Sequence, residues 1–227
     1  MNKFIIAVVI AVLFINPIFS QDWANLKRFQ KDNTELMSSK SKDPRIVLMG
    51  NSITEGWLNF SPEFFEGKNY INRGIGGQTT PQMLLRFRQD VVDLNPAVVV
   101  ILAGINDIAG NTGPSTIEMI EDNIISMAEI AKANGIKVVL SSVLPAYDFP
   151  WKQGLEPAEK VVKLNKLLKK YARKQKMVYL DYFSAMADKK NALIEELGYD
   201  GVHPNAAGYK VMEPLFEKAV KKALAKK

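Results

Sequence analysis

Short apolar segments that alternate with longer amphipathic ones constrain the fold of this 227-residue chain more than any other feature. Three of them, 45–50, 97–103 and 136–143, are apolar over most of their length, and 69–72 and 177–180 are shorter segments of the same kind. Strands that are apolar on both faces must be covered on both sides. The pattern therefore indicates a parallel sheet enclosed by helices.

Segments with apolar residues three and four positions apart predict helices between these strands. The clearest is 114–134, and the other expected helices are 23–37, 80–94, 157–175 and 205–225. This alternation predicts a single doubly wound α/β domain with a parallel sheet of about five strands. Ligands of such sheets bind beyond the carboxyl ends of the strands, where every motif described below is found.

The N-terminal residues differ from the rest of the chain. Lys3 precedes an apolar run, 4–15, and the small residue Ser20 stands at a plausible cleavage position. These features predict a secretory signal peptide over 1–20 and a mature domain over 21–227. An uncleaved membrane anchor is the alternative, although the run is short for a membrane span. We expect an exported protein, periplasmic or extracellular, with no stable membrane insertion after cleavage.

The composition excludes several kinds of chemistry. The chain has no cysteine, which rules out disulfides, thiolate nucleophiles and cysteine-bound metals. Its formal net charge is +6, and basic residues gather in 160–176 and 218–227. Both segments keep apolar residues at helical spacing and lack interleaved aromatics, which favours solvated helix faces. We therefore expect no nucleic-acid partner.

The chain contains one histidine, His203, within the sequence Asp-Gly-Val-His-Pro at 200–204. An enzyme that activates a serine by imidazole base catalysis can use only this residue. Asp200 lies three positions upstream, where its carboxylate could orient the ring and stabilise the protonated form. A lone histidine in a turn is more often a surface or packed residue, so the other motifs must decide.

A serine follows the first expected strand, in the sequence Gly-Asn-Ser-Ile-Thr-Glu-Gly-Trp at 50–57. Ser52 would stand where the strand turns into a helix, near N–H groups that favour developing negative charge. The alternative is structural: Ser52 and Glu55 fit the capping-box pattern, so the serine could do no more than cap the helix.

Two further motifs stand at the ends of the next strands. Gly74 lies in Asn-Arg-Gly-Ile-Gly-Gly-Gln-Thr-Thr at 72–80, where glycines allow close approach of the backbone to a ligand. A phosphate-binding loop is less favoured, because the glycine spacing differs and no Walker lysine follows. Asn106 lies in Gly-Ile-Asn-Asp at 104–107; its amide can donate to an oxyanion, or the pair can simply begin a helix.

In this order and spacing, the four motifs together resemble those of the SGNH hydrolases, the GDSL-type esterases and lipases, over roughly 45–204. The resemblance implies a flavodoxin-like three-layer α/β/α domain, which matches the fold expected above. It also implies a serine esterase without metal or organic cofactor. The implied site comprises a catalytic triad, Ser52, Asp200 and His203, and an oxyanion hole, Ser52, Gly74 and Asn106.

One position departs from the family pattern, and two other acids need to be weighed. Asn51 stands where the family usually has aspartate, so we expect different hydrogen bonds around Ser52. Asp107 and Asp181 also lie near strand ends and are rival triad acids. Asp200 is favoured because the family motif specifies its spacing from the histidine.

Aromatic residues are the main indication of the substrate. The loop after the fourth strand carries Tyr147, Phe149 and Trp151, and Trp57 follows the proposed nucleophile. We expect these rings to bind substrate, although packing the loop onto the domain is an equally good explanation. Together with export, they favour an esterase that removes small acyl groups, especially acetyl, from a small-molecule or carbohydrate ester.

Two other functions remain open. The first is a lysophospholipase, a thioesterase or an enzyme like the platelet-activating-factor acetylhydrolases, which the segment 74–80 resembles. The second is a carbohydrate-binding protein that keeps the fold without catalysis. The binding protein is disfavoured because all the groups required for ester hydrolysis are present.

Overall fold

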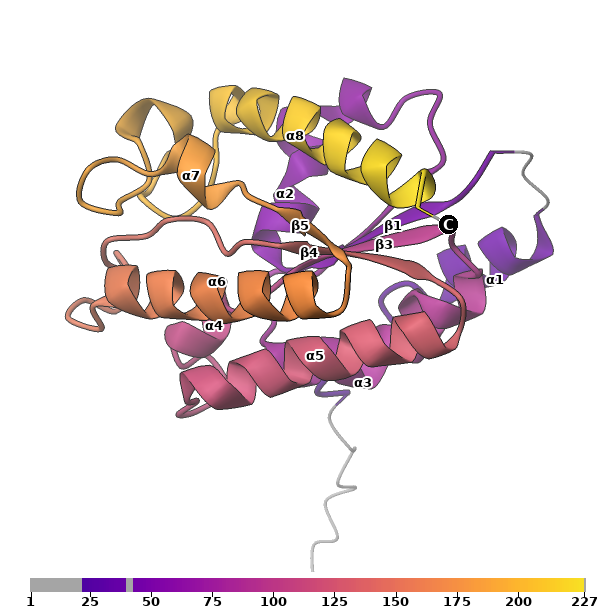
Figure 1. Ribbon diagram of the computed structural model, residues 1–227, viewed down its shortest axis with the longest axis horizontal. Helices are drawn as coiled ribbons and strands as arrows, with labels where there is room; N and C mark the ends of the chain where they lie inside the picture. Colours follow the sequence, from indigo (N-terminus) through magenta and orange to yellow (C-terminus); the bar gives the residue numbers. More distant parts are fainter. Residues whose placement is uncertain (1–21, 40–42, 227) are drawn as a thin grey trace, which may run out of the picture.

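A computed structural model describes residues 22–39 and 43–226 as one α/β domain (Figure 1). Its five strands are all parallel and follow the order β2-β1-β3-β4-β5. The strands are β1 (Ile46–Gly50), β2 (Tyr70–Gly74), β3 (Val98–Leu102), β4 (Lys137–Ser141) and β5 (Val178–Leu180). Each corresponds to one of the expected apolar segments, so the parallel sheet is confirmed. The predicted signal peptide, 1–20, lies outside the described residues.

Helices cover both faces of the sheet and complete the three layers. On one face lie α2 (Ser52–Phe60) and α8 (Ala206–Leu224), and on the other α3 (Thr80–Asp90), α5 (Ile117–Ala133) and α6 (Pro157–Lys174) (Figure 1). Because β1 and β3 lie between these layers, all of their residues are buried. None of the helices in the described ranges is long and apolar enough to cross a membrane.

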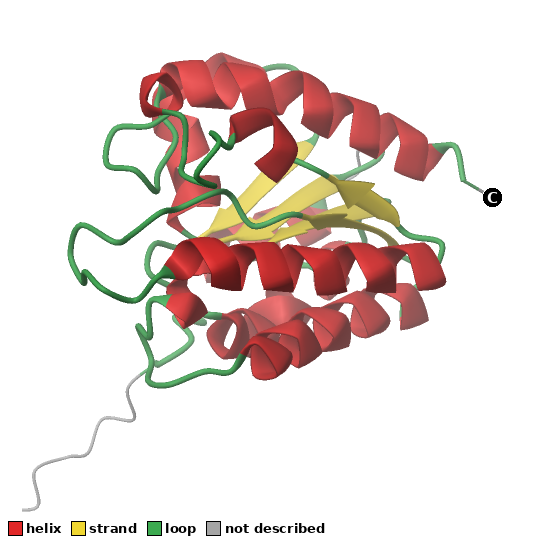
Figure 2. Ribbon diagram, turned by 60° about the vertical axis from the view of Figure 1, so that its left-hand side comes forward, coloured by secondary structure: helices red, strands yellow, loops and turns green. Residues whose placement is uncertain are grey.

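The carboxyl ends of the strands meet at one edge of the sheet, which we call the carboxyl edge. Figure 2 shows long loops gathered there. Two short helices, α4 (Ile105–Ile108) and α7 (Phe183–Met186), also begin at this edge, directly after β3 and β5. The parallel register therefore brings together residues that lie far apart in the sequence.

Helix α1 spans only Gln30–Ser38, so it is shorter than the helix expected over 23–37. The residues before it form turns, with Asn25 in the left-handed region at φ 55°. Their backbone carbonyls accept hydrogen bonds from glutamine side chains of α3 and the turn before it, as Ala24 does from Gln78 at 2.8 Å. These long-range bonds replace those of a regular helix.

Candidate active site

Ser52 is the first residue of α2, directly beyond the end of β1. The helix is capped by Asn51, whose Oδ1 accepts a hydrogen bond from the N–H of Ile53 at 3.0 Å. The interpretation of Ser52 as the capping residue is therefore wrong. Asn51 satisfies the helix terminus, so the half-buried Ser52 hydroxyl is available for another partner.

Asp200 and His203 are held together by their own loop. Asp200 Oδ1 accepts the N–H of Val202 at 2.9 Å and of His203 at 2.7 Å, while Asp200 Oδ2 lies 2.7 Å from His203 Nδ1. Gly201 adopts φ 81°, which glycine tolerates without strain. The pairing of this acid with this ring thus depends on residues adjacent in sequence.

The serine and the histidine meet across the fold. Ser52 Oγ lies 2.9 Å from His203 Nε2, although the two residues are 151 positions apart. Helix α8 brings them together: it begins directly after the histidine loop, and its Tyr209 hydroxyl donates to the carbonyl of Ile53 in α2 at 2.8 Å. A continuous hydrogen-bonded chain therefore runs from the serine through the imidazole to the carboxylate.

The environment of Asp200 keeps its carboxylate charged. Partial burial raises its pKa, but the hydrogen bonds from the His203 N–H and ring and from the Val202 N–H together outweigh burial. They hold the pKa of Asp200 below its ordinary value. An ionised carboxylate at this position stabilises a protonated imidazole.

The two rival acids have other partners. Asp107 is buried at α4 and accepts hydrogen bonds from the N–H of Thr80 at 3.0 Å and from its hydroxyl at 2.6 Å. Asp181 accepts the N–H of Ser184 at 3.1 Å and pairs with Lys169 at 3.3 Å. Neither has a hydrogen bond to His203 within the described part of the chain, whereas Asp200 does.

Gly74 does not have the role expected for it. Its N–H donates to Asn72 Oδ1 at 2.9 Å, so this donor is already engaged. The reason for a glycine is packing: a Cβ here would collide with the backbone nitrogen of Glu55 in α2. The expectation that the Gly74 N–H lines the oxyanion hole is therefore wrong, because this N–H is bonded to Asn72 and the end of β2 packs tightly against α2.

The turn after β2, residues 75–78, approaches Ser52. A Cβ on Gly76 would lie 3.9 Å from that of Ser52. The next residue, Gly77, adopts φ 75°, and its N–H has no hydrogen-bond partner within residues 22–39 and 43–226. Asn106 Nδ2 donates to the carbonyl of Gln78 at 3.0 Å, so the buried Asn106 amide lies against this turn.

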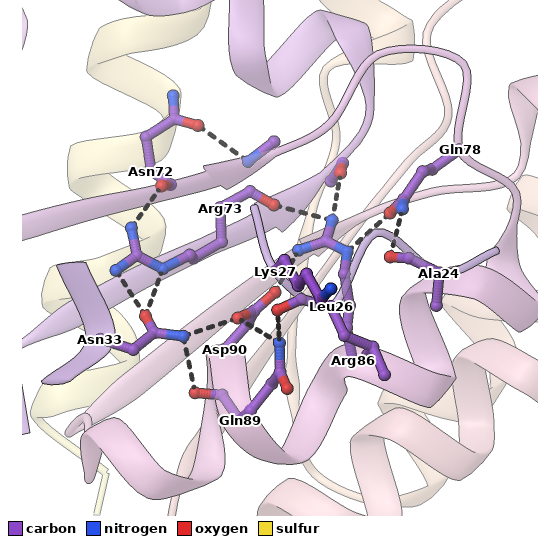
Figure 3. Close-up of polar contacts among 12 residues, drawn as sticks. Ala24, Leu26, Lys27, Asn33, Asn72, Arg73, Gln78, Arg86, Gln89 and Asp90 are labelled. Atoms are coloured by element: carbon purple, nitrogen blue, oxygen red, sulfur yellow. Dashed lines mark hydrogen bonds and ion pairs between the residues drawn. The ribbon is translucent and has the colours of Figure 1, made fainter. Parts of the chain in front are cut away.

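A buried polar network lies behind this turn (Figure 3). We call it the arginine cluster: Asn33, Arg73, Gln78, Arg86 and Asp90, all buried. Arg86 donates to Gln78 Oε1 at 2.6 Å, to Asp90 Oδ2 at 3.0 Å, and to the carbonyls of Gly50 and Arg73 at 3.0 and 2.9 Å. One guanidinium thus connects the end of β1, next to Ser52, to the turn that Asn106 contacts.

Two of the expected substrate-binding aromatics are buried. Trp57 is only 2% exposed and stacks on Phe64 with ring centroids 5.0 Å apart, inside a cluster of core rings. Phe149 is fully buried and packs against Trp151, with centroids 5.3 Å apart. The expectation that they contact substrate is wrong, since α2 turns Trp57 inward and Phe149 anchors its loop to the core.

The other aromatics of the loop are exposed. Trp151 is 49% exposed, and its ring centroid lies 5.9 Å from that of His203. Tyr147 is also exposed, and lines a hollow together with Asp148, Gly154 and Glu156. The structure thus brings Trp151 next to His203, and the substrate roles of Trp151 and Tyr147 stay predictions.

Sequence reasoning did not identify Tyr199, Gly77 or Arg86. Tyr199 stacks on His203, with ring centroids 5.6 Å apart and planes inclined by 11°. Its place directly before Asp200 was a usable signal, because a short loop keeps its residues close together. For Gly77, two consecutive glycines after a strand were the signal. The position of Arg86 in α3 offered none, since arginine on a helix usually faces solvent.

Comparison with known proteins agrees with this geometry. A family model described as GDSL-like lipase/acylhydrolase matches residues 48–211. A solved structure from Bacteroides fragilis, assigned to the acylhydrolases, is 49% identical, with a TM-score of 0.87 over 90% of this chain and 99% of that one. An acetyl xylan esterase shares the fold at a TM-score of 0.63 and 20% identity, covering 78% of this chain and 99% of its own.

Curated relatives are more distant. The alpha2 subunit of platelet-activating factor acetylhydrolase IB from Rattus norvegicus is 25% identical over 193 residues, which cover 82% of this chain and 80% of the subunit. The uncharacterized lipoprotein YqeF of Bacillus subtilis is 32% identical over 117 residues, so the match covers 44% of this chain and 48% of YqeF. Because the family model spans more than half of the sequence, this chain belongs to the GDSL-like lipase/acylhydrolase family of ester hydrolases.

Proposed function

We propose that this protein is an exported serine esterase that removes small acyl groups, chiefly acetyl, from carbohydrates. The observation that carries the esterase mechanism is the hydrogen-bonded chain from Ser52 Oγ to His203 Nε2 and from His203 Nδ1 to Asp200 Oδ2, at 2.9 and 2.7 Å. These distances lie within the range needed for direct proton transfer to an imidazole base.

The proposed reaction begins with attack of Ser52 Oγ on the ester carbonyl while His203 Nε2 accepts the hydroxyl proton. The ionised Asp200 keeps the proton on Nδ1 and stabilises the imidazolium that forms. The imidazolium then protonates the departing alcohol, which leaves an acyl-enzyme. Water, deprotonated by the same imidazole, releases the acid and restores the serine.

The negative charge on the carbonyl oxygen needs donors beside Ser52. We assign this role to the N–H of Ser52, the Asn106 amide and the N–H of Gly77, in place of Gly74. Three observations support the choice: Asn106 is buried against the 75–78 turn, Gly76 approaches Ser52, and the Gly77 N–H is unpaired in the described ranges. Donors held in place before the reaction stabilise the transition state without reorganisation.

The acetyl-carbohydrate substrate is supported by the surroundings of His203. Trp151 places an exposed aromatic surface next to the ring that must protonate the leaving alcohol. An acetyl xylan esterase with the same fold shows that such a sheet can carry this activity. Aromatic faces offer an apolar surface on which a sugar ring can lie while its hydroxyl groups stay in water.

Export is supported by the N-terminal sequence. Lys3, the apolar run at 4–15 and Ser20 have the order of a signal peptide. The Bacillus subtilis relative is named as a lipoprotein, which is consistent with a location outside the cytoplasm. Mass spectrometry of the protein secreted by its host would identify its first residue; a chain that begins at Met1 would contradict cleavage.

A second candidate function is hydrolysis of acetylated phospholipids. It is favoured by the alignment with platelet-activating factor acetylhydrolase over 82% of this chain. A small acyl group is common to both candidates, and they differ in the alcohol that is released.

The experiment that tests the proposal measures hydrolysis of 4-nitrophenyl acetate, 4-nitrophenyl palmitate, O-acetylated xylose and an acetylated phosphocholine lipid. We expect kcat/KM to be highest for the acetyl esters and measurable on the sugar. A preference for palmitate, or turnover of the lipid without the sugar, would contradict the carbohydrate proposal. Labelling of the wild type but not of Ser52→Ala by a fluorophosphonate would identify the nucleophile.

A further inference from the structure

A row of aromatic rings leads away from the catalytic histidine along the surface. The Tyr199 ring stacks on His203 with centroids 5.6 Å apart, and the Phe60 ring stacks on Tyr199 with centroids 5.7 Å apart. The planes within these pairs are inclined by only 11° and 26°. We call Phe60, Tyr199 and His203 the aromatic row; it joins the end of α2 to the loop that precedes α8.

The rings of this row are offset and partly uncovered. Carbon atoms in contact are about 3.5–4.0 Å apart, so near-parallel rings with centroids at 5.6 Å must be displaced sideways. The offset leaves part of the Tyr199 ring uncovered, whereas the Phe60 ring is also stacked on the buried Tyr209, with centroids 5.8 Å apart. Tyr199 is 59% exposed and Phe60 39% exposed, which is high for large rings that core packing could have buried.

The position of the aromatic row relative to His203 Nε2 indicates which part of the ester substrate the row can contact. His203 Nε2 is the atom that returns the proton to the departing alcohol, so the alcohol oxygen must lie beside this ring. The carbonyl oxygen points instead toward the proposed oxyanion donors at Asn106 and the 75–78 turn. Groups that extend from His203 therefore face the alcohol part of the ester.

We propose that Tyr199 and Phe60 form a binding subsite for the alcohol, and that this alcohol is an oligosaccharide rather than a single sugar. The inference rests on the proposed function and extends it. In a pyranose the C–H bonds beside oxygen atoms carry partial positive charge, which an aromatic face attracts. Two successive rings, the nearer at Tyr199 and the farther at Phe60, provide surface for two successive sugar units.

The arrangement of the rings favours a saccharide over a choline headgroup. A quaternary ammonium is recognised by aromatic faces that converge on one point. The rings here are close to parallel along the row, so their faces do not enclose a common centre. A long acyl chain is also disfavoured, because the row lies at the surface, where such a chain would stay in water.

The test compares O-acetylated xylotriose with O-acetylated methyl xyloside and with 4-nitrophenyl acetate. Phe60→Leu is the decisive variant, because Phe60 stacks on Tyr199 and has no ring contact with His203 in the described part of the chain. We expect it to lower kcat/KM for the trisaccharide about 3- to 10-fold relative to 4-nitrophenyl acetate, through KM. Tyr199→Leu should raise KM for both sugars.

Leu58→Ala provides the matched control. Leu58 lies on the same helix and is 45% exposed, close to the value for Phe60, but it is not part of the row. We expect the ratio of trisaccharide to 4-nitrophenyl acetate activity to stay unchanged in this variant. Thermal unfolding of all variants separates a binding effect from a loss of folded protein.

The two levels of the proposal fail in different ways. A wild-type enzyme that cleaves 4-nitrophenyl acetate but neither sugar would overturn the carbohydrate function, and the subsite with it. A wild type that cleaves both sugars, with a trisaccharide KM unaffected by Phe60→Leu, would overturn only the subsite. A KM increase confined to an acetylated phosphocholine lipid would contradict the saccharide assignment.

Discussion

Two polar groups of the molecule, the proposed catalytic triad and the arginine cluster, are built in opposite ways. In the triad, the side chains of His203 and Asp200 remain 18% and 24% exposed. In the arginine cluster, Arg86 is fully buried and all of its bonds go to protein groups: Gln78, Asp90 and two backbone carbonyls. Both groups link segments that are far apart in sequence.

This difference in exposure corresponds to two different roles of polar groups, stabilising the fold and contacting the substrate. A buried charge is tolerated only when its partners satisfy it, and removing one partner leaves the others uncompensated. The arginine cluster therefore stabilises the positions of Gly50 and Gln78. The triad leaves one side open, because a substrate must approach Ser52. Changes in the triad should affect rate, and changes in the cluster should affect stability.

The largest effect is expected for the triad itself. Ser52→Ala and His203→Ala should each lower kcat for 4-nitrophenyl acetate by about 10⁶, because no second histidine can replace His203. The melting temperature should change little, since neither side chain supports the core. Steady-state kinetics and calorimetry measure the two quantities. Substantial hydrolysis by either variant would refute the assignment of the nucleophile or the base.

The arginine cluster should show the reverse pattern. Arg86→Met leaves the carboxylate of Asp90 and the carbonyls of Gly50 and Arg73 with fewer donors, at an expected cost of about 3–5 kcal/mol in the free energy of unfolding. Arg88→Met is the control on the same helix, where the exposed side chain should contribute within about 0.5 kcal/mol. Equal stability of the two variants in urea would contradict the structural role of Arg86.

Asn106 donates to the carbonyl of Gln78, a member of the arginine cluster, and is also a proposed oxyanion donor, so it tests whether rate and stability can be separated. Asn106→Ala removes a proposed oxyanion donor and should lower kcat about 10²- to 10³-fold. Asn111→Ala is the matched control, because its amide bonds the carbonyl of Gly77 in the same turn at 3.1 Å but at an exposed position. Equal losses of kcat in both variants would indicate that turn stability, and not an oxyanion donor, matters.

A further effect concerns pH. Burial raises the pKa of Asp107 to about 6, although hydrogen bonds from Thr80 oppose this. The folded state then holds a proton that the unfolded state has lost, so stability falls as pH rises from about 4 to about 6. The full effect is on the order of 3 kcal/mol. Urea denaturation across this range should give a flatter profile for Asp107→Asn; an identical slope would show that Asp107 does not titrate there.

Most of the fold could be predicted from the sequence, because its apolar segments leave few alternatives. Each expected strand is present, and the alternation with helices led to the parallel, three-layer arrangement. The helix expected over 23–37, before the first strand, was too long. Three glutamine side chains, Gln78 among them, donate hydrogen bonds to backbone carbonyls of its first residues, and apolar spacing does not reveal such bonds. Local patterns cannot report such long-range partners.

The site was predicted unevenly for the same reason. The proximity of Asp200 and His203 follows from a short loop, whereas the role of Asn106 as an oxyanion donor stays a prediction. Gly74 was misassigned because three glycines lie at the end of β2 and in the turn after it, and only the three-dimensional contacts, such as the hydrogen bond of Gly74 to Asn72, distinguish them. Trp57 was misjudged because its distance from Ser52 in sequence says nothing about which side of α2 faces the core.

The sequence by itself determined the layers of the fold, the one available imidazole and the acid that accompanies it, because these depend on apolar periodicity, composition and a local loop. The tertiary structure alone decided that Ser52 meets His203, since α8 must pack on α2 to bring them within 2.9 Å. It also decided which rings reach the surface beside the histidine. Side-chain exposure depends on packing between segments that are distant in sequence, and a pattern in the linear sequence carries little information about that packing.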